Sequence, residues 1–420
     1  MRDPMRSILL RFGLWLGLVM AAAPAHAAEP PPEITIDEAL RILRDESPRW
    51  AADRAQLGLA EADVLQAGLW SNPSLSYNVL QLAQGANTGA VTTHQVTLEQ
   101  PLLIFGQRGQ RLEAARAAQN AARAGLTARF AEHARELHHT FVEILGAQEK
   151  LRLLTESQQE IQRAEAIVRG RAAAGDRSQY DVLRTALEAR ALDSELATAE
   201  TERLHAVGLL AQLLGRPGWS PRARGDLTPI ESSQMVDLLW ERAQEDHPAI
   251  ESARRRIGQA EAALAMARRE RLPEIALQVG MTATQAENSL SIFGGVVTPL
   301  PLWNRQQGAI ARARAEHTIA AQEHRAVLAE TEAALERAIA VSRSRHAAAA
   351  RIASEVFAHL PELRRMAEES YRQGKSGIVD LLDSFRGLKA LRMQYVEQIV
   401  GAEQAKVDLL YASGFTGGQR

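Results

Sequence analysis

The sequence predicts a mainly α-helical fold with a small β part, in which one structural unit occurs twice. Three observations support this fold class: a composition rich in helix formers, two long stretches almost free of proline, and landmarks that recur 200 residues later. Ala, Leu, Glu, Arg and Gln favour helices, whereas Phe, Trp and Tyr make up only 5% of the 420 residues. This composition indicates long helices that pack closely through small side chains.

Proline and glycine residues near helix ends mark the duplication. At an offset of 200 residues they are Pro48 and Pro248, Pro73 and Pro273, and Pro101 and Pro301. Further along the chain the offset is 199, as for Gly175 and Gly374 and for Gly215 and Gly414. This register predicts two copies of one unit, at residues 28–214 and 235–414. Residues 215–234, rich in Gly and Pro, are predicted to link them, although a plain surface loop has the same composition. Residues 415–420 form a C-terminal tail.

The first copy begins with helices at residues 37–69, which break before Pro48 because a residue preceding proline disfavours helical geometry. Alternating apolar and polar residues predict strands at about 74–82 and 91–100, with a turn at residues 84–89 between them. Pro101 is expected to end the second strand. A long helical hairpin follows at residues 108–214, and its first helix, at residues 108–171, would be about 96 Å long.

The second copy repeats this order. Helices are predicted at residues 235–271, strands at about 274–282 and 290–298, and a long helical hairpin at residues 305–412. Pro361 is expected to kink the first helix of this hairpin near its far end. Helices of such length need partners along their sides.

The N-terminus has the pattern of a secretory signal peptide. Arg2 and Arg6 are followed by an apolar run at residues 12–23 and by Ala25-His26-Ala27, an A-x-A cleavage pattern. The run is too short to be a membrane-spanning anchor, so residues 1–27 are predicted to be removed. The chain has no cysteine, which excludes disulfides and thiol catalysis. Its net charge of −2 gives no electrostatic case for binding nucleic acid.

The four predicted strands match the length and alternation of transmembrane β-strands. A hairpin with one face in water shows the same pattern, so alternation alone leaves both readings open. Four strands cannot close a barrel, because bacterial barrels have at least eight, and open strand edges are too costly in lipid. If the strands enter a membrane, several chains must therefore share one barrel.

Several short motifs point to a known family. They are Gln66-Ala67-Gly68 with Asn72-Pro73, Gln100-Pro101-Leu102 with Gly106-Gln107-Arg108, and the run Pro-Leu-Pro-Leu-Trp-Asn-Arg-Gln-Gln-Gly at residues 299–308. Over residues 36–414 the sequence resembles the TolC-type outer-membrane efflux proteins. It is most similar to their heavy-metal (cobalt–zinc–cadmium) branch, which often has Gly-Gly-Lys-Arg where this chain has Phe105-Gly106-Gln107-Arg108.

The resemblance implies a homotrimer in the outer membrane, with a twelve-stranded β-barrel and a twelve-helix α-barrel that extends into the periplasm. Its partners would be a periplasmic adapter (membrane fusion) protein and an inner-membrane pump of the resistance–nodulation–division type. The chain would be a passive conduit, with heavy-metal cations as the expected cargo. A multidrug or type I secretion channel stays open as an alternative. So does a protein of another class, a coiled-coil periplasmic scaffold or adapter without a pore.

The resemblance also implies a periplasmic gate where the hairpins turn. Its candidate residues are Tyr371, Asp380, Asp383, Asp181, Arg372 and Lys375. Asp380 and Asp383 share one helix face, and in a trimer that face would gather six carboxylates near the axis. Asp181 is expected to bond to Tyr371, and Arg372 and Lys375 to form ion pairs at the closed end. The alternative is that both aspartates are solvated acids at a helix N-terminus, where the helix dipole favours them.

The two hairpin turns are also the expected docking tips for the adapter, with candidate residues Gly175, Ser178, Gly374 and Ser376. Glycines of an ordinary helical turn would look the same. The histidines of the long helices lack the spacing of a metal site, so no metal site or other cofactor is expected. No nucleophile elbow or phosphate loop occurs, and we expect no enzymatic activity.

Overall fold

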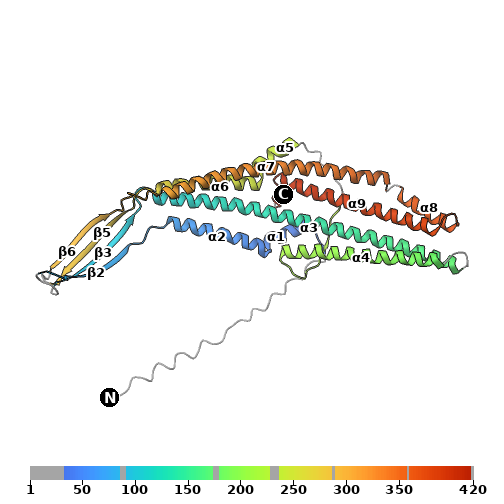
Figure 1. Cartoon of the computed structure of the whole chain (residues 1–420), viewed down its shortest axis with the longest axis horizontal. Coiled ribbons are helices and arrows are strands. Elements are labelled where there is room, and N and C mark those ends of the chain that lie inside the picture. The colour runs from blue at the N-terminus through green and yellow to red at the C-terminus, as the bar shows by residue number, and fades with distance from the viewer. Residues whose placement is uncertain are drawn as a thin grey trace, which may run out of the picture.

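The computed structural model describes residues 33–85, 91–173, 179–227, 236–285, 289–356 and 359–417. The molecule is elongated, with a β-sheet at one end and a layer of long helices running from it to two helical hairpin ends (Figure 1). The prediction of a mainly helical fold with a small β part is confirmed. The proposed signal peptide (residues 1–27) and most of the predicted turn at residues 84–89 lie outside the described residues.

The first half of the chain contains two short helices, two strands and one long hairpin. In order they are α1 (Ile36–Asp45), α2 (Pro48–Gly68), β2 (Ser74–Gln81), β3 (Thr92–Leu102), α3 (Gln107–Ala173) and α4 (Gln179–Leu214). A capping box starts α1, in which the Thr35 hydroxyl oxygen accepts from the Glu38 amide and the Glu38 carboxylate accepts from the Thr35 amide. Helix α3 has 67 residues and is therefore about 100 Å long.

The second half repeats this order with one difference in its hairpin. It contains α5 (Val236–Asp246), α6 (Pro248–Arg269), β5 (Ile275–Thr284), β6 (Ser289–Val297), α7 (Gln307–Arg351), a π-helical turn (Ile352–Val356), α8 (Leu360–Arg372) and α9 (Ile378–Ala412). Prolines occupy the first turns of α2 and α6, where a missing N–H costs no hydrogen bond. A short parallel pair, β1 (Glu33–Ile34) with β4 (Arg222–Ala223), was not predicted.

Two expectations about proline need correction. Pro101 does not end the second strand, because β3 continues to Leu102 and Pro101 pairs with Ala276. Glu99 is the last residue of β3 that pairs with β2, so Pro101 lies where one side of the strand is open and a missing N–H is tolerated. The second long helix is not kinked at Pro361: α7 ends at Arg351, the π-helical turn follows, and Pro361 lies in the first turn of the separate helix α8.

The sheet is antiparallel, in the order β2-β3-β5-β6, and its two faces differ in polarity. Residues paired across the strands share a face, and one face is mostly apolar in all four strands. Its apolar side chains are Leu75, Tyr77, Val79, Val96, Leu98, Leu277, Val279, Met281, Leu290, Ile292 and Val296. The opposite face is mostly polar, with Ser76, Thr97, Gln278 and Ser291 among its residues. The apolar face is exposed in the single chain, as in Leu75 (72%) and Ile292 (79%).

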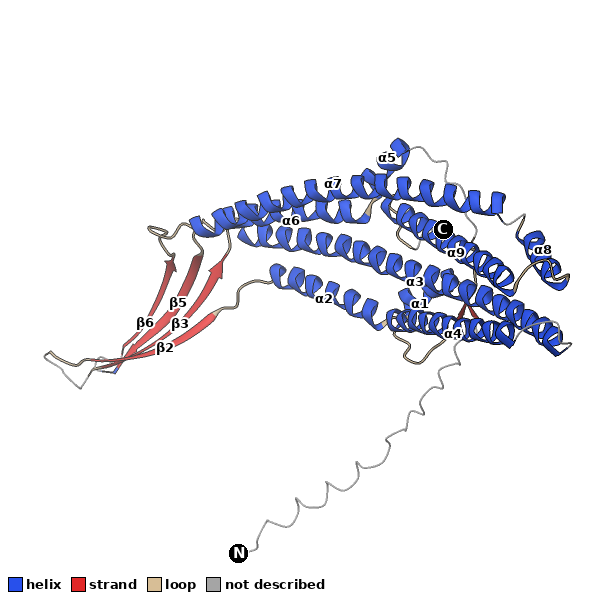
Figure 2. Cartoon of the chain, turned by 45° about the vertical axis from the view of Figure 1, so that its right-hand side comes forward, coloured by secondary structure: helices blue, strands red, loops and turns tan. Residues whose placement is uncertain are grey.

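The helices next to the sheet continue its lateral order. Helix α2 packs on α3, α3 on α6, and α6 on α7, so the row is α2-α3-α6-α7 (Figure 2). Nearer the hairpin ends α4 takes the place of α2 and α9 that of α6. Midway along, an apolar core that includes Trp50, Phe130 and Leu137 is formed by α1, α2, α3, α4, α9 and the chain around Trp219. Within the described residues, no helix has the length and apolar character that crossing a membrane requires.

Candidate functional site at the hairpin ends

The predicted gate residues belong to the end of the molecule farthest from the sheet, where α3 meets α4 and α8 meets α9 (Figure 1). An apolar cluster joins the two hairpins there. Its fully buried members include Val168 from α3, Tyr371 from α8, and Leu381 and Leu382 from α9. Heptad-like apolar positions on facing helices bury one another in this way, so the two halves of the chain form one packed unit at this end.

Tyr371 connects the two hairpin ends. Its side chain is completely buried, its backbone oxygen accepts a hydrogen bond from the Arg171 guanidinium, and that guanidinium lies 5.4 Å from the centre of its ring. A cation near an aromatic ring face is favourable. Gly374 follows with a φ of +74°, a left-handed conformation that glycine adopts without strain. The structure therefore brings Tyr371 and Gly374 together with Arg171, which sequence reasoning had not singled out.

Asp181 is buried in the first turn of α4, with 7% of its surface exposed. Its backbone oxygen accepts from the Thr185 hydroxyl at 2.9 Å. Val182, the next residue, packs on the same apolar cluster as Tyr371. The bond between Asp181 and Tyr371 stays a prediction.

Asp380 and Asp383 have different partners, although both are exposed near the start of α9. The Asp380 carboxylate accepts from the Gly377 amide at 2.9 Å and so caps the helix. The Asp383 carboxylate pairs with Arg386 at 3.2 Å on the same helix. Arg372 and Lys375 are exposed and have no ion pair among the residues that the structure describes. The cation that pairs with Asp383 is therefore Arg386.

Arg386 also bridges the two halves of the chain. Its guanidinium donates to both carboxylate oxygens of Glu188 on α4, and the hydrogen bond from Nε to Oε1 is 2.9 Å long. These hydrogen bonds are the main reason why the pKa of Glu188 is lowered from its usual value. Lys389, one turn further along α9, pairs with Glu195 at 2.6 Å. Acids of α4 thus face bases of α9, an arrangement that no local motif reveals because the partners lie almost 200 residues apart in sequence.

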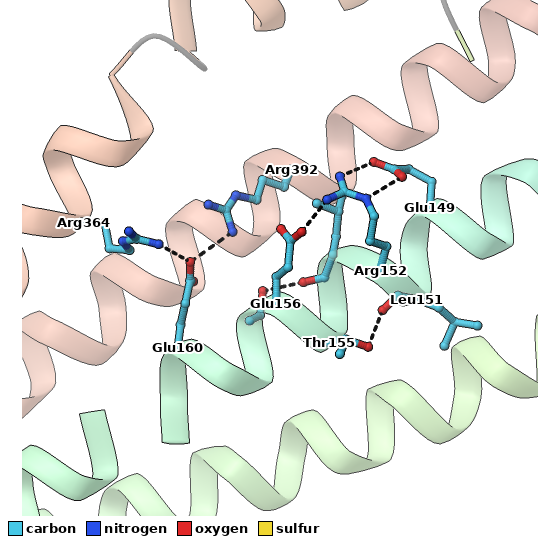
Figure 3. A network of polar contacts seen from close by, with 10 residues as sticks. Glu149, Leu151, Arg152, Thr155, Glu156, Glu160, Arg364 and Arg392 are labelled. Atoms are coloured by element: carbon cyan, nitrogen blue, oxygen red, sulfur yellow. Dashed lines mark hydrogen bonds and ion pairs between the residues drawn. The ribbon is translucent and has the colours of Figure 1, made fainter. Parts of the chain in front are cut away.

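Glu160 forms a second bridge, drawn in Figure 3. It is buried (5% exposed) on α3, and its carboxylate accepts from Arg364 of α8 at 3.0 Å and from Arg392 of α9 at 3.4 Å. Arg152, about two turns earlier on α3, pairs instead with Glu149 and Glu156 of its own helix. A buried acid with two arginines fixes the position of α8 relative to α3. Sequence reasoning missed this site, since Glu160 lies in an ordinary helical stretch.

The remaining predicted positions are placed only in part. Gly175 and Ser178 lie outside the described residues, while Gly374 and Ser376 belong to the turn between α8 and α9. In the described part of the chain, no group of three or more His, Cys, Asp and Glu residues is arranged to hold a metal ion. Two histidines of α3 have partners on other helices: His133 lies 2.9 Å from Asp53 of α2, and His139 lies 2.8 Å from Asp408 of α9.

The fold is similar to that of a solved outer-membrane channel. It superposes on a solved structure of the outer-membrane channel OprN with a TM-score of 0.77 and 18% sequence identity, covering 91% of this chain and 90% of that one. The family model of outer membrane efflux proteins matches residues 39–216 and 239–414. The chain therefore belongs to the outer membrane efflux protein family, and it is an outer-membrane protein.

Two relatives carry names that refer to metal resistance. The cobalt-zinc-cadmium resistance protein CzcC of Cupriavidus metallidurans is 26% identical over 380 residues, which cover 89% of this chain and 87% of that protein. The nickel-cobalt-cadmium resistance protein NccC of Alcaligenes xylosoxydans xylosoxydans is 25% identical over 304 residues, covering 70% of this chain and 66% of that protein.

Proposed function

We propose that the chain is the outer-membrane duct of a tripartite efflux system, in which three copies form one passive channel. In this proposal β2, β3, β5 and β6 of each copy build a shared twelve-stranded barrel, and the helices build a tube through the periplasm. The two halves of the chain are copies of one unit joined by a linker. A periplasmic adapter and a resistance–nodulation–division pump of the inner membrane would supply the cargo.

The observation that most supports this proposal is the open sheet with its one exposed apolar face. The strands have 8, 11, 10 and 9 residues, close to the length that crosses a membrane as tilted strands. In the described chain, β2 and β6 each have one edge without a neighbouring strand. Lipid cannot hydrogen-bond to such edges, so each edge needs the opposite edge of another copy.

We further propose that the hairpin ends are the periplasmic gate and the docking site of the adapter. Asp380 and Asp383 are exposed, as carboxylates around a pore axis would have to be. Tyr371, Asp181, Arg372 and Lys375 would hold the hairpin ends in the closed position. The turns at Gly175 and Ser178 and at Gly374 and Ser376 would contact the adapter.

The proposed cargo is heavy-metal cations, because the relatives CzcC and NccC are named for resistance to cobalt, zinc, cadmium and nickel. A duct needs no tight metal site, since tight binding would slow release. This point is tested in a strain from which the gene is deleted. Growth is measured in the presence of each metal and of organic drugs, and export of a secreted polypeptide is measured separately. Loss of metal tolerance alone supports the proposal; loss of drug tolerance or secretion alone favours the multidrug or type I secretion channel.

The channel itself is tested by fractionation and electrical recording. The protein should be recovered from outer membranes as a trimer that resists detergent and dissociates on heating. In planar bilayers it should open rarely, and Asp380→Asn with Asp383→Asn should change the conductance of the closed state. An asparagine oxygen at position 380 can still accept the hydrogen bond from the Gly377 amide at the start of α9, so a changed fold would not explain the result. A monomer without conductance, found free in the periplasm, contradicts the channel and supports the scaffold alternative.

Docking of the adapter has a separate test. Single cysteines at Ser178 and Ser376 should cross-link to the adapter in intact cells. The same reagent should give no adapter adduct from a cysteine at Leu59, which lies on α2 near the sheet. Adducts from Leu59 but not from the hairpin ends would contradict the docking proposal.

A further inference from the structure

The four strands of the sheet contain a single acidic or basic side chain. Glu99 of β3 is the only Asp, Glu, Lys or Arg in the described strands β2, β3, β5 and β6. It lies on the polar face, where it pairs with Ser74 of β2 and Gln278 of β5. This face would line the interior of the proposed barrel, because the apolar face has to meet lipid. A charge that stands alone on such a wall sets the sign of the field beside it.

The Glu99 carboxylate is held by its neighbour on the next strand. The Gln278 side-chain amide donates to one of its oxygens at 2.6 Å. Glu99 is half-buried and forms no ion pair among the residues that the structure describes. At the same end of the sheet, Arg111 pairs with two other acids, Glu270 and Glu274, at 3.0 and 3.2 Å. Within the described chain, the charge of Glu99 is therefore not compensated by a paired base.

The rest of the polar face in these strands is neutral, and much of it is small. Ser76, Thr97 and Gly280 belong to it. The larger Phe293 ring lies close against the sheet, since a Cβ on Gly280 would be 2.5 Å from it. Small neutral side chains discriminate poorly between ions of opposite sign. The group on this face that distinguishes a cation from an anion is the Glu99 carboxylate.

The interior of the proposed barrel is narrow enough for this charge to act across it. Twelve strands about 4.8 Å apart and tilted by about 40° enclose a backbone cylinder roughly 12 Å in radius. A glutamate side chain reaches about 5 Å inward, which brings three symmetry-related carboxylates to roughly 7 Å from the axis. The screening length is about 8 Å at physiological ionic strength, so the carboxylates influence ions throughout this cross-section. An ion keeps its hydration water there, and selection is by the sign of its charge.

We propose that Glu99 is the residue that makes the barrel of the duct selective for cations. Three copies of it form a ring three residues before the end of β3, where the helical tube opens into the barrel. The ring favours hydrated cations over anions without binding them tightly, as release from a duct requires. This inference rests on the trimeric channel of the proposed function, and it adds the residue that selects the cargo by charge.

Reversal potentials in planar bilayers, measured under a gradient of potassium chloride, test the ring. The parent is the full chain with Asp380→Asn and Asp383→Asn, so that the carboxylates of the hairpin ends do not contribute to selectivity. In this parent, Glu99→Gln should lower the ratio of potassium to chloride permeability by roughly tenfold at 0.15 M ionic strength and by about twofold at 1 M, because salt screens the three charges. Glu99→Asp is the matched control, since it keeps the charge and should keep most of the ratio.

Moving the carboxylate to the neighbouring strand gives a second readout. Ser74 is exposed and lies opposite Glu99 on the same face. Ser74→Glu combined with Glu99→Gln therefore returns a carboxylate to the same level of the barrel, and this double variant should regain most of the lost ratio. Gln278→Arg places a base beside Glu99 and should lower the ratio as Glu99→Gln does.

The outcomes separate the ring from the proposed function. A Glu99→Gln channel with the permeability ratio of the parent overturns the role of Glu99 and leaves the channel standing. An equal fall in Glu99→Asp also overturns it, because the effect would then come from the hydrogen bond with Gln278 and not from charge. If Glu99→Gln does not assemble into trimers, an unchanged ratio in Gln278→Arg overturns the ring. Absence of conductance in both the wild type and the parent overturns the ring and the proposed function together.

Discussion

At the scale of single residues, burial decides which charged groups contribute most to the stability of the fold. Of the ion pairs near the hairpin ends, many join neighbours on one helix and are exposed, so each contributes only a few tenths of a kcal/mol. Glu160 differs, because it is buried and its two arginine partners come from other helices. Removing one partner of a buried ion pair leaves the remaining charge buried and unpaired. The resulting loss of stability is far larger than the net contribution of the pair.

Glu160→Gln should therefore destabilise the fold by about 3 kcal/mol. This is the low end of the range for buried pairs, because Arg364 remains about one-third exposed. Denaturant unfolding of the purified protein measures the loss. Glu156→Gln is the matched control: it lies on the same helix, pairs with Arg152 at i,i+4 and is 44% exposed, so its effect should stay below about 0.5 kcal/mol. Equal losses in both variants would contradict the assigned role of burial.

His138 makes the fold sensitive to mild acid. Burial lowers the pKa of His138 from 6.5 to about 4, and its Nδ1 lies 3.2 Å from the Tyr411 hydroxyl oxygen. The folded state therefore binds the proton less readily than the unfolded state. The stability that depends on neutral His138 is therefore fully present above pH 6.5 and is lost as the pH falls toward 4. The free energy of unfolding should fall by about 2 kcal/mol between pH 7 and pH 5.

His138→Gln should flatten this pH dependence, measured as the unfolding midpoint at pH 7 and pH 5. Gln keeps a polar group for Tyr411 but does not titrate. His205→Gln serves as the control, because His205 is exposed and its removal disturbs no packing. If the unfolding midpoint of the His138 variant depended on pH as strongly as that of the wild type, another group would be responsible for the acid sensitivity.

At the scale of elements, the sheet shows how neighbouring residues acquire opposite environments. Side chains alternate between faces along a strand, so Val279 lies on the apolar face and Gln278 on the polar one, 2.6 Å from the Glu99 carboxylate. Gly280 meets a further constraint, since a Cβ there would lie 2.5 Å from the Phe293 ring and 2.6 Å from the Val96 backbone oxygen. The close approach of these strands requires glycine at this position.

Val279→Arg should lower the yield of the proposed trimer in the outer membrane, because the apolar face would meet lipid in the proposed barrel and an arginine there costs roughly 2–4 kcal/mol near the middle of the bilayer. Gln278→Arg should be tolerated, since its side chain lies on the polar face of the sheet beside Glu99, the face that would line the interior of the proposed barrel. Heat-modifiable trimer in outer-membrane fractions measures both variants. The same loss for both, or a loss for Gln278→Arg alone, would reverse the assignment of the faces.

At the scale of the whole molecule, the two halves of the chain are tied together at the end opposite the sheet. Arg386 connects α9 to Glu188 on α4, and Arg171 connects α3 to Tyr371 on α8. The halves also join side by side along α3 and α6. If the proposed duct opens by separation of its hairpin ends, these ties have to break or rearrange.

Arg386→Gln should loosen the hairpin ends without unfolding the chain. The expected loss is about 1 kcal/mol, since the arginine is 42% exposed and solvent screens the pair. Limited proteolysis should then cut near the ends of α4 and α8 faster than in the wild type, and the channel should open more often in planar bilayers. Arg190→Gln removes an exposed pair within α4 and should change neither rate.

The sequence by itself determined the elements and their order. Proline positions, the 3.6-residue and 2-residue periodicities and the repeat at 200 residues depend on local backbone chemistry, which neighbours in sequence largely settle. The break before Pro48, the four strands and the long helix of 67 residues were therefore predictable. The apolar face of the sheet followed from alternation in the same way.

Only the tertiary structure decided which distant residues meet. The bridges from Glu160 and Glu188 join residues about 200 positions apart, and the burial that gives them weight arises when the two hairpins pack. The end of α7 before Pro361 and the continuation of β3 through Pro101 also depend on neighbours, because a proline is accepted wherever its missing N–H has no partner to lose. Local chemistry fixes helices and strands; the pairing of charges between them exists only after folding.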